Sequence, residues 1–424
     1  MKKALFLILA VTMVLGPTAC TRQVSAEVVK SDKPRVVSPA VSQTDMASLV
    51  DGNSAFAFNL YRALKNTDGN LFYSPYSISE ALAMTYGGAR GDTEKQIAAA
   101  LHFSLTQNQL HPVFNSLDQE LAKRGQGAKG KDEKGFRLHV VNAIWGQKDF
   151  KFTTEYLDLL AQNYGAGLRI VDFINATEQS RTNINQWVSD QTESKIKDLI
   201  PLGVIDQLTR LVLTNAIYFN AAWKNPFTTE ATSSGKFHRL DGSDVSVPLM
   251  KQTKSFGYAQ GDNYQVVELP YDGNELSMVI ILPGLEQFKA TEASLNSQQV
   301  NSMIRSIQSR QMILTMPKFR FESSFGLKKT LSSIGMPVAF TADADFSGMD
   351  GKRDLHIKDV VHKSFIYVDE AGTEAAAATG VIMGVTSMPA SPIEVTIDHP
   401  FIFLIRDIKT GTVLFVGRVL SPSL

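Results

Sequence analysis

The amino-acid sequence predicts an α+β fold, and three features of its pattern support this class. Apolar residues recur at helical spacing in the first half of the chain, for example in residues 54–65. The second half is dominated by β-branched and aromatic stretches separated by turn residues. Helices and strands do not alternate regularly, which argues against a parallel βαβ array. With 424 residues, 44% of them hydrophobic, the chain can bury a large core in one domain or in two or three.

Helices are expected mainly in the first half and strands in the second. Residues 71–103 are typical of a short strand, a helix that begins after Ser74-Pro75 and ends at Gly87-Gly88, and a further helix. Residues 136–146 resemble a strand and residues 184–192 a helix. The long apolar stretch 209–223 suits a buried central strand. More strands are expected at residues 274–284, 310–323, 363–372 and, around a turn at Lys409-Thr410-Gly411, 399–420.

The N-terminus has the pattern of a signal peptide. Two lysines precede an apolar stretch at residues 4–15, and small residues follow it. We therefore expect residues 1–19 to be a signal peptide. Cys20, the only cysteine of the chain, stands where a bacterial lipoprotein is cut and acylated, although Pro17 replaces the leucine usual in that motif. A cut after Ala26, which would release a soluble protein, is the alternative.

Residues 20–45 are polar with scattered Pro and Ser, which predicts a flexible tether. The globular domain is expected at residues 46–424. The N-terminal pattern places the protein outside the cytoplasm, either secreted or attached by a lipid to the bacterial envelope. After the N-terminus, no apolar run reaches the roughly 18–20 residues that span a bilayer.

Charge and short motifs argue against several classes of function. Lys plus Arg and Asp plus Glu both number 42, so no net charge draws the chain to nucleic acid. A GxGxxG match at residues 125–130 lacks the flanking strand and helix of a dinucleotide site. A calcium-loop spacing from Asp343 to Asp354 lacks the bidentate Glu at its last position. We therefore predict no metal and no other cofactor.

A penicillin-recognising serine enzyme is a remote alternative. Residues 194–197 match SxxK, residues 218–220 resemble Tyr-x-Asn and residues 409–411 match KTG, in the order found in that class. However, Pro201 would end a helix soon after Lys197, and the Tyr-x-Asn lies in an apolar strand.

Five stretches, in the same order as in the family, resemble the serpins, and the similarity runs from about Met46 to Leu424. They are FYSPYSISEALAMTYGGARGDTEKQI, LVLTNAIYFNAAWKNPF, PYDGNELSMVIILP, DEAGTEAAAAT and DHPFIFLIRD. The resemblance implies one domain of three β-sheets with eight to nine helices and an exposed reactive loop at about residues 372–395. It implies a monomeric suicide inhibitor of serine proteases, which traps the acyl-enzyme by inserting its cleaved loop into the central sheet. A non-inhibitory serpin that acts as a carrier is the alternative.

The start of the predicted loop suits insertion as a strand. Alternate side chains of a strand point to opposite faces, and the face that begins with Thr373 carries no charge. Gly372 can adopt dihedral angles closed to other residues, and the small residues after it lower the steric barrier to entering a sheet. The expected hinge residues are Glu370, Gly372, Thr373, Glu374, Ala375, Ala376, Ala377, Ala378 and Thr379.

Two polar clusters match positions that the family uses to control insertion. The shutter lies beneath the strands that must part, and the breach lies where insertion begins. Buried polar groups need partners, so such a cluster can close two strands and form again around a third. The shutter residues are Ser74, Ser77, Asn215 and His362, and the breach residues are Trp223, Lys318 and Glu370.

The composition of the loop indicates the class of target protease. The reactive bond is expected between Thr386 and Ser387, with Val385, Met388 and Pro389 as alternates. No Arg or Lys lies between Glu374 and Pro400, so a trypsin-like protease, whose pocket needs a cation, is a poor target. Small and aliphatic residues suit an elastase-like or subtilisin-like protease. A papain-like cysteine protease is left open as a second kind of partner.

Overall fold

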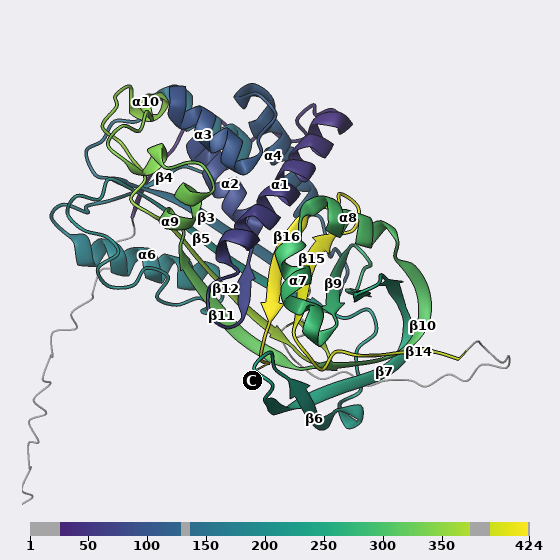
Figure 1. Ribbon diagram of the computed structural model, residues 1–424. Coiled ribbons are helices and arrows are strands. Elements are labelled where there is room, and N and C mark those ends of the chain that lie inside the picture. The colour runs from purple at the N-terminus through teal and green to yellow at the C-terminus, as the bar shows by residue number, and fades with distance from the viewer. Residues whose placement is uncertain (1–25, 129–135, 374–390, 423–424) are drawn as a thin grey trace, which may run out of the picture.

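The computed structural model describes residues 26–128, 136–373 and 391–422 (Figure 1). The α-helices in these ranges are α1 (Gln43–Leu64), α2 (Pro75–Tyr86), α3 (Gly91–Leu101), α4 (Gln107–Leu121), α5 (Thr154–Tyr164), α6 (Thr177–Gln191), α7 (Phe288–Ser294), α8 (Ser297–Arg305), α9 (Lys328–Ser333) and α10 (Ser347–Asp350). The strands are β1 (Glu27–Val29), β2 (Leu71–Tyr73), β3 (Arg137–Gln147), β4 (Leu168–Val171), β5 (Leu211–Ala222), β6 (Ser233–His238), β7 (Asp244–Gln260), β8 (Tyr264–Pro270), β9 (Leu276–Pro283), β10 (Gln308–Pro317), β11 (Phe319–Gly326), β12 (Val360–Val368), β13 (Gly372–Thr373), β14 (Ile393–Thr396), β15 (Phe401–Asp407) and β16 (Val413–Val419). Short 3-10 helices lie at η1 (Thr229–Ala231), η2 (Leu285–Gln287) and η3 (Val338–Phe340). None of the described helices is both long and apolar enough to cross a membrane.

The described elements form two hydrogen-bonded sheets with helices packed around them, which confirms the α+β class. One sheet has seven strands in the order β1-β4-β3-β5-β13-β12-β11. The other has nine, in the order β14-β10-β7-β8-β9-β15-β16-β2, with β6 paired to β7.

The count of sheets and helices differs from the expectation for physical reasons. Strand β7 is 17 residues long and pairs with β6 through residues 244–249, with β10 through 249–258 and with β8 through 257–260. Strand β7 therefore joins into one sheet the strands that were expected to form two separate sheets. The described residues hold ten α-helices rather than eight or nine, because α9 and α10 are short turns of six and four residues.

The predicted central strand is confirmed as β5, which is buried along all but its last residue. It pairs antiparallel with β3 and parallel with β12. A strand covered on both faces needs apolar side chains in succession, and the sequence of β5 supplies them.

Helix α2 lies between the two sheets. The Ser74 side chain accepts a hydrogen bond from the Ser77 N–H, and Pro75 occupies the first helical position, so the sequence fixes where the helix begins. All twelve residues of α2 are buried. A helix covered on every face needs apolar or small side chains all round. Its contacts with β3, β5 and β16 bring its first turn close to the centre of the seven-stranded sheet.

The structure corrects the expectation of a flexible tether for residues 26–42. Strand β1 pairs antiparallel with β4 at an edge of the seven-stranded sheet. The Arg35 Nε donates to Asn115 Oδ1 over 2.7 Å, and its guanidinium pairs with Asp118 Oδ2 at 2.6 Å. The Val36 N–H donates to the Gln162 carbonyl over 2.9 Å. The Pro and Ser residues that indicated flexibility therefore lie in a segment held by contacts with α4 and α5. Residues 1–19 and Cys20 lie outside the described residues.

We predict that Arg35→Ala destabilises the fold. The substitution removes a charge-assisted contact and leaves the fully buried Asn115 with one partner fewer. The free energy of unfolding should fall by about 2 kcal/mol, which is measured as a lower midpoint of urea unfolding. Lys33→Ala is the control, because the Lys33 side chain is 54% exposed in its ion pair with Asp158. Its expected change is about 0.5 kcal/mol or less. Equal midpoints for Arg35→Ala and the parent would contradict the structural role of this segment.

Candidate functional site

The candidate site is the line along which β5 and β12 can separate. These strands pair directly over residues 213–217 of β5 and 360–364 of β12. Farther along, β13 lies between them, with Thr373 opposite both Val368 of β12 and Ala221 of β5. The sheet is thus closed at one end, while at the other end a third strand has begun between the two.

Gly372 enters the sheet at a point where no side chain fits. A Cβ atom at this position would lie 2.2 Å from the carbonyl oxygen of Ala221 and 2.8 Å from Cα of Ala222. Its φ of 155° is also one that residues with a side chain rarely adopt. The predicted hinge glycine is therefore required by the close approach of β13 to β5.

The three breach residues lie together beside β13. The Lys318 Nζ is 2.8 Å from Glu370 Oε2, and the hydroxyl of Thr232 donates to Glu370 Oε1 over 2.7 Å. The indole N–H of Trp223 donates to the carbonyl of Asp369 over 3.0 Å. Burial acts to raise the pKa of Glu370, but the hydrogen bonds from Lys318 and Thr232 hold that pKa below its usual value. These contacts hold the turn that connects β12 to β13.

Tyr271 joins the breach to the loop, and sequence reasoning missed it. Its ring stacks on Trp223 with centroids 4.7 Å apart and planes 10° apart. Its hydroxyl hydrogen-bonds the hydroxyl of Thr373 over 2.9 Å. Both Tyr271 and Thr373 are buried. The quoted stretch PYDGNELSMVIILP contains Tyr271, but nothing local in the sequence indicates its distant partner.

The four shutter residues also lie together, at the closed end of the β5–β12 pair. Asn215 and His362 face each other in register on the two strands, and the Asn215 Oδ1 is hydrogen-bonded to His362 Nδ1. The Ser74 N–H points to His362 Nε2 over 3.3 Å, and the amide of Asn215 donates to Ser77 Oγ. Because Nε2 accepts, the neutral His362 carries its proton on Nδ1. All four residues are fully buried.

Two further residues extend the shutter and were not predicted. Asn142 lies on β3 in register with Asn215, and its Oδ1 accepts from both Asn215 Nδ2 and Ser77 Oγ. The Asn142 Nδ2 donates to Glu80 Oε2 over 2.8 Å. The polar row Asn142, Asn215 and His362 therefore crosses three neighbouring strands and ends on a buried carboxyl group. Asn142 is a polar residue within the predicted strand 136–146, and this position could have indicated that it belongs to the shutter.

Burial shifts the pKa values of two shutter groups in ways that keep both groups neutral. Burial, with the nearby Asp118 carboxylate as a smaller cause, raises the pKa of Glu80 from 4.5 to about 8. Burial lowers the pKa of His362 from 6.5 to about 3. A protonated His362 would also direct a second N–H at the N–H of Ser74, where no acceptor lies.

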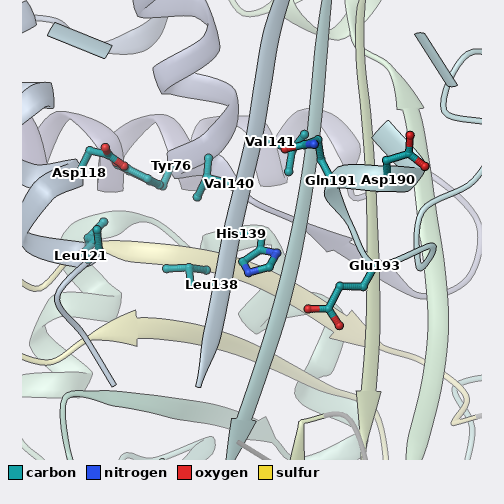
Figure 2. A pocket seen from close by; sticks show the side chains of 11 residues that line it. Tyr76, Asp118, Leu121, Leu138, His139, Val140, Val141, Asp190, Gln191 and Glu193 are labelled. Carbon is teal, nitrogen blue, oxygen red and sulfur yellow. The ribbon is translucent and has the colours of Figure 1, made fainter. Parts of the chain in front are cut away.

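A hollow of about 510 Å³ lies near the shutter, between α4, β3 and the end of α6 (Figure 2). Figure 2 shows Asp118 on one side of His139 and Glu193 on the other. Asp118 is paired with Arg35, and Glu193 with Arg137. Among the described residues that line it there is no serine, threonine or cysteine, and the hydroxyl group present is that of Tyr76. The part of the chain that the structure describes also holds no group of three or more side chains suited to a metal ion.

The structure separates the motifs of the remote enzyme alternative. Ser194 and Lys197 lie in the loop after α6, whereas Tyr218 lies within β5. Lys409 and Gly411 belong to the turn between β15 and β16, in the other sheet. The predicted hinge residues from Glu374 to Thr379 and the expected reactive bond lie outside the described residues, as do its alternates Val385, Met388 and Pro389.

The shutter predicts a characteristic dependence of stability on pH. Between pH 4.5 and 8 the folded state keeps the Glu80 proton that the unfolded chain releases, so rising pH favours unfolding. Between pH 6.5 and 3 the unfolded chain protonates His362 and the folded state does not, so falling pH favours unfolding. Between pH 4.5 and 6.5, the effects of Glu80 and His362 on the pH dependence of stability oppose each other. Stability should therefore fall as pH rises from 6.5 to 8.

Glu80→Gln should remove that fall, because the amide stays neutral in both states. The free energy of unfolding of Glu80→Gln, relative to that of the parent, should grow from pH 4.5 to 8. The difference should reach a few kcal/mol, at about 1.4 kcal/mol for each unit of pKa shift. Urea unfolding at half-unit pH steps measures it. Glu155→Gln, on the exposed surface of α5, is the control and should follow the parent. Parallel profiles for Glu80→Gln and the parent would show that Glu80 is not held neutral.

Comparison with known proteins agrees with this geometry. The family model described as serpin (serine protease inhibitor) matches residues 51–422. Leukocyte elastase inhibitor A of Mus musculus is 41% identical over 389 residues, which cover 89% of this chain and all of that protein. An uncharacterized serpin-like protein of Thermococcus kodakarensis is 39% identical over 376 residues, covering 88% of this chain and 86% of that protein.

Two solved structures are similar to this chain over most of its length. The native state of the thermophilic serpin tengpin has a TM-score of 0.82 at 28% identity, and the match covers 94% of this chain and all of tengpin. Uncleaved ovalbumin has a TM-score of 0.78 at 26% identity, covering 88% of this chain and all of that protein. The family description is that of a protease inhibitor and not of an enzyme, as the sequence predicted. A strand that begins between β5 and β12, a shutter beneath it and these matches show that the chain belongs to the serpin family.

Proposed function

We propose that this chain is a suicide inhibitor of an elastase-like or subtilisin-like serine protease. The observation that carries the proposal is β13, because Gly372 and Thr373 already lie between β5 and β12. Cleavage farther along the loop would free the segment after Thr373 to continue this strand into the sheet. Serpin loop insertion is an established case of strand addition to a sheet.

The register of β13 supports insertion without burial of a charge. Thr373 lies opposite Val368, and both side chains are buried. In an antiparallel continuation, Ala375 and Ala377 would point to the same face as Thr373, toward the core. Glu374 would point to the opposite face. The segment would therefore avoid the large penalty for burying an unpaired ion.

Insertion needs the closed end of the sheet to open first. The direct pairing at residues 213–217 and 360–364 and the Asn215–His362 contact must both break. An inserted strand would then pair on both sides, so the final sheet would hold more backbone hydrogen bonds than the initial one. We infer that the uncut form is metastable and persists because of this kinetic barrier.

The chemistry would be supplied by the protease. Its serine oxygen would attack the carbonyl carbon of Thr386, and an ester bond would form. The peptide bond to Ser387 would break, and the new amine would leave with the proton delivered by the protease histidine. Insertion before water reaches the ester would carry the attached protease along the sheet. The serpin contributes the loop and the sheet and no catalytic group.

Two observations support the proposed class of target protease. The loop between Glu374 and Pro400 contains no Arg or Lys, and its residues near the expected bond are small or aliphatic. Relatives from mouse, pig and human are described as leukocyte elastase inhibitors. Both favour a protease with a small apolar pocket over one that needs a basic residue.

The proposed function predicts a covalent adduct. Incubation with pancreatic elastase or subtilisin should give a band of summed mass that survives SDS, and the nicked chain should melt at a higher temperature than the intact one. Thr373→Arg should be cleaved but form about tenfold less adduct or less, because the buried Thr373 site cannot accept a charge. Thr341→Arg, at an exposed position, is the control and should form the adduct like the parent.

Several results would contradict the proposal. The absence of an adduct with every serine protease tried, together with equal melting temperatures for cut and uncut chains, would refute insertion. Equal adduct yields for Thr373→Arg and Thr341→Arg would show that β13 is not where insertion begins. Trypsin should yield no adduct at the expected bond.

We also propose that the N-terminus attaches the protein to the envelope of a bacterium through a lipid on Cys20. The support is the signal-like pattern before Cys20. In cells that process lipoproteins, labelled palmitate should enter the parent protein and not Cys20→Ser. Labelling of both, or of neither, would contradict lipid attachment at this residue.

A further inference from the structure

The seven-stranded sheet carries a second, smaller hydrophobic core on the face that α6 covers. Alternate residues of β5 divide between the two faces, because Leu213 belongs to the main core and Val212 and Ala216 to the smaller one. Strand β12 contributes Val361 to the smaller core. Further members come from β3, β4, α6 and the segment of residues 192–210, which leads from α6 into β5 and which we call the connecting loop. The connecting loop therefore shares a core with both strands that insertion would part.

Helix α6 holds the connecting loop in a fixed conformation. The Asn185 side chain donates to the Ile200 carbonyl over 3.0 Å and accepts from the Ile200 N–H over 2.8 Å. The Ile196 N–H donates to the hydroxyl of Thr192 over 3.2 Å. Both Ile196 and Ile200 are fully buried. The connecting loop cannot follow a moving strand without losing these contacts.

An ion pair joins the connecting loop to the segment that leads into β12. Asp206 lies in the connecting loop shortly before β5, and Lys358 lies shortly before β12. The Lys358 Nζ is 2.6 Å from Asp206 Oδ2. The other carboxylate oxygen accepts from the Leu208 N–H over 3.0 Å and from the hydroxyl of Thr209 over 3.1 Å, so the carboxylate is held in position by its own turn. The hydrogen bond from Lys358 is the main cause that holds the pKa of Asp206 below its usual value.

A hydrogen bond from β12 itself makes a second connection. Lys363 lies on β12 opposite Ala216 of β5, and its Nζ donates to the Lys197 carbonyl of the connecting loop over 2.9 Å. The same Nζ is 3.0 Å from Glu322 Oε2 on β11, which lies on the far side of β12 from β5. If β5 and β12 part, Lys363 can keep Glu322 and lose only the carbonyl. The connection can therefore be released without leaving an unpaired charge.

Both contacts cross the line between β5 and β12. Neighbouring strands of a sheet lie about 4.8 Å apart, so a strand that enters between β5 and β12 must separate them further by about that distance. While the connecting loop stays on α6, neither the ion pair of 2.6 Å nor the hydrogen bond of 2.9 Å can survive such a displacement. Strand entry therefore requires both contacts to break or the connecting loop to leave its core.

We propose that Lys358 and Lys363 form a clasp, which holds the connecting loop to β12 and sets the rate at which a new strand enters the sheet. The clasp consists of the ion pair of Lys358 with Asp206 and the hydrogen bond from Lys363 to the Lys197 carbonyl. Its consequence for inhibition rests on the proposed function, because there the cleaved loop must enter before the ester is hydrolysed. A weaker clasp then gives more adduct for each cleavage.

The register of β13 gives the stage at which the clasp acts. Thr373 lies opposite Ala221. A strand continued in this register would pass Ala216, the partner of Lys363, and then Leu213, where the direct pairing of β5 with β12 ends. The clasp therefore restrains the later part of insertion, whereas the breach contacts hold its start.

The test measures entry of a separate strand and needs no protease. A labelled synthetic peptide with the sequence of residues 373–386 is incubated with the intact chain, and its uptake into a complex that survives native electrophoresis is followed in time. Lys358→Met should take up the peptide about two- to fivefold faster than the parent, as expected when one partly exposed ion pair no longer has to break. Lys363→Met should also be faster. Lys236→Met is the matched control, because it removes an exposed ion pair with Asp244 in the other sheet, and it should match the parent.

Two further measurements separate a clasp from a pair that is merely structural. Asp206→Asn keeps the oxygen that accepts from Thr209, and K358M/D206N should take up the peptide at the rate of Lys358→Met alone, because both substitutions break the same contact. After cleavage of the loop, the nicked parent and nicked Lys358→Met should melt at the same temperature, because the clasp is already open in that state.

Equal rates of peptide uptake for Lys358→Met, Lys363→Met and the parent would overturn the clasp and leave the proposed inhibition standing. The absence of uptake by all of these chains would also overturn the clasp, and the separate adduct experiment then decides the inhibitory function. A rate for K358M/D206N equal to the product of the two single effects would show that Lys358 and Asp206 act independently, which contradicts the proposal.

Discussion

The structure depends on the direct pairing of β5 with β12 at one end of the seven-stranded sheet. The contact between Asn215 and His362 reinforces that pairing from within a fully buried polar row. Such a row is stable only while every member has a partner, so it favours two arrangements, closed or reorganised around a new strand, over any intermediate one. The first turn of α2, which brings Ser74 and Ser77 to the row, thereby couples the closed state of this sheet to the packing of the whole core.

At the opposite end of the same strand pair, β13 lies between β5 and β12. Trp223, Tyr271 and Glu370 hold the turn into β13 through stacking and hydrogen bonds. The described part of the loop enters the sheet with Gly372 and Thr373. The two ends therefore have different chemistry, with an internal amide and imidazole network at one and an aromatic and ionic cluster at the other. In the proposed mechanism, this asymmetry would direct loop insertion from the breach toward the shutter. It would also allow a barrier and a starting point to coexist in one sheet.

Local sequence features predicted much of this arrangement. The Ser-Pro start of α2 and the apolar stretch of β5 each indicate their own structure, and the family resemblance added the shutter and breach positions. Contacts between distant segments could not be predicted in this way. Tyr271 meets Thr373 102 residues later, Asn142 and Glu80 join the shutter from separate elements, and Arg35 finds Asp118 across 83 residues. The length of β7, which joins two expected sheets, is likewise a property of tertiary pairing.

The stacked pair of Trp223 and Tyr271 makes the molecule its own optical reporter. The chain has three tryptophans, and the other two, Trp145 and Trp187, pack against each other beneath Arg169 at the far side of the sheet. Trp223 lies beside β13, where a new strand would begin to grow, and its indole N–H is held by a backbone carbonyl of the connecting turn. A rearrangement around Trp223 would change the tryptophan emission of the protein, so insertion could be followed in real time without any attached dye.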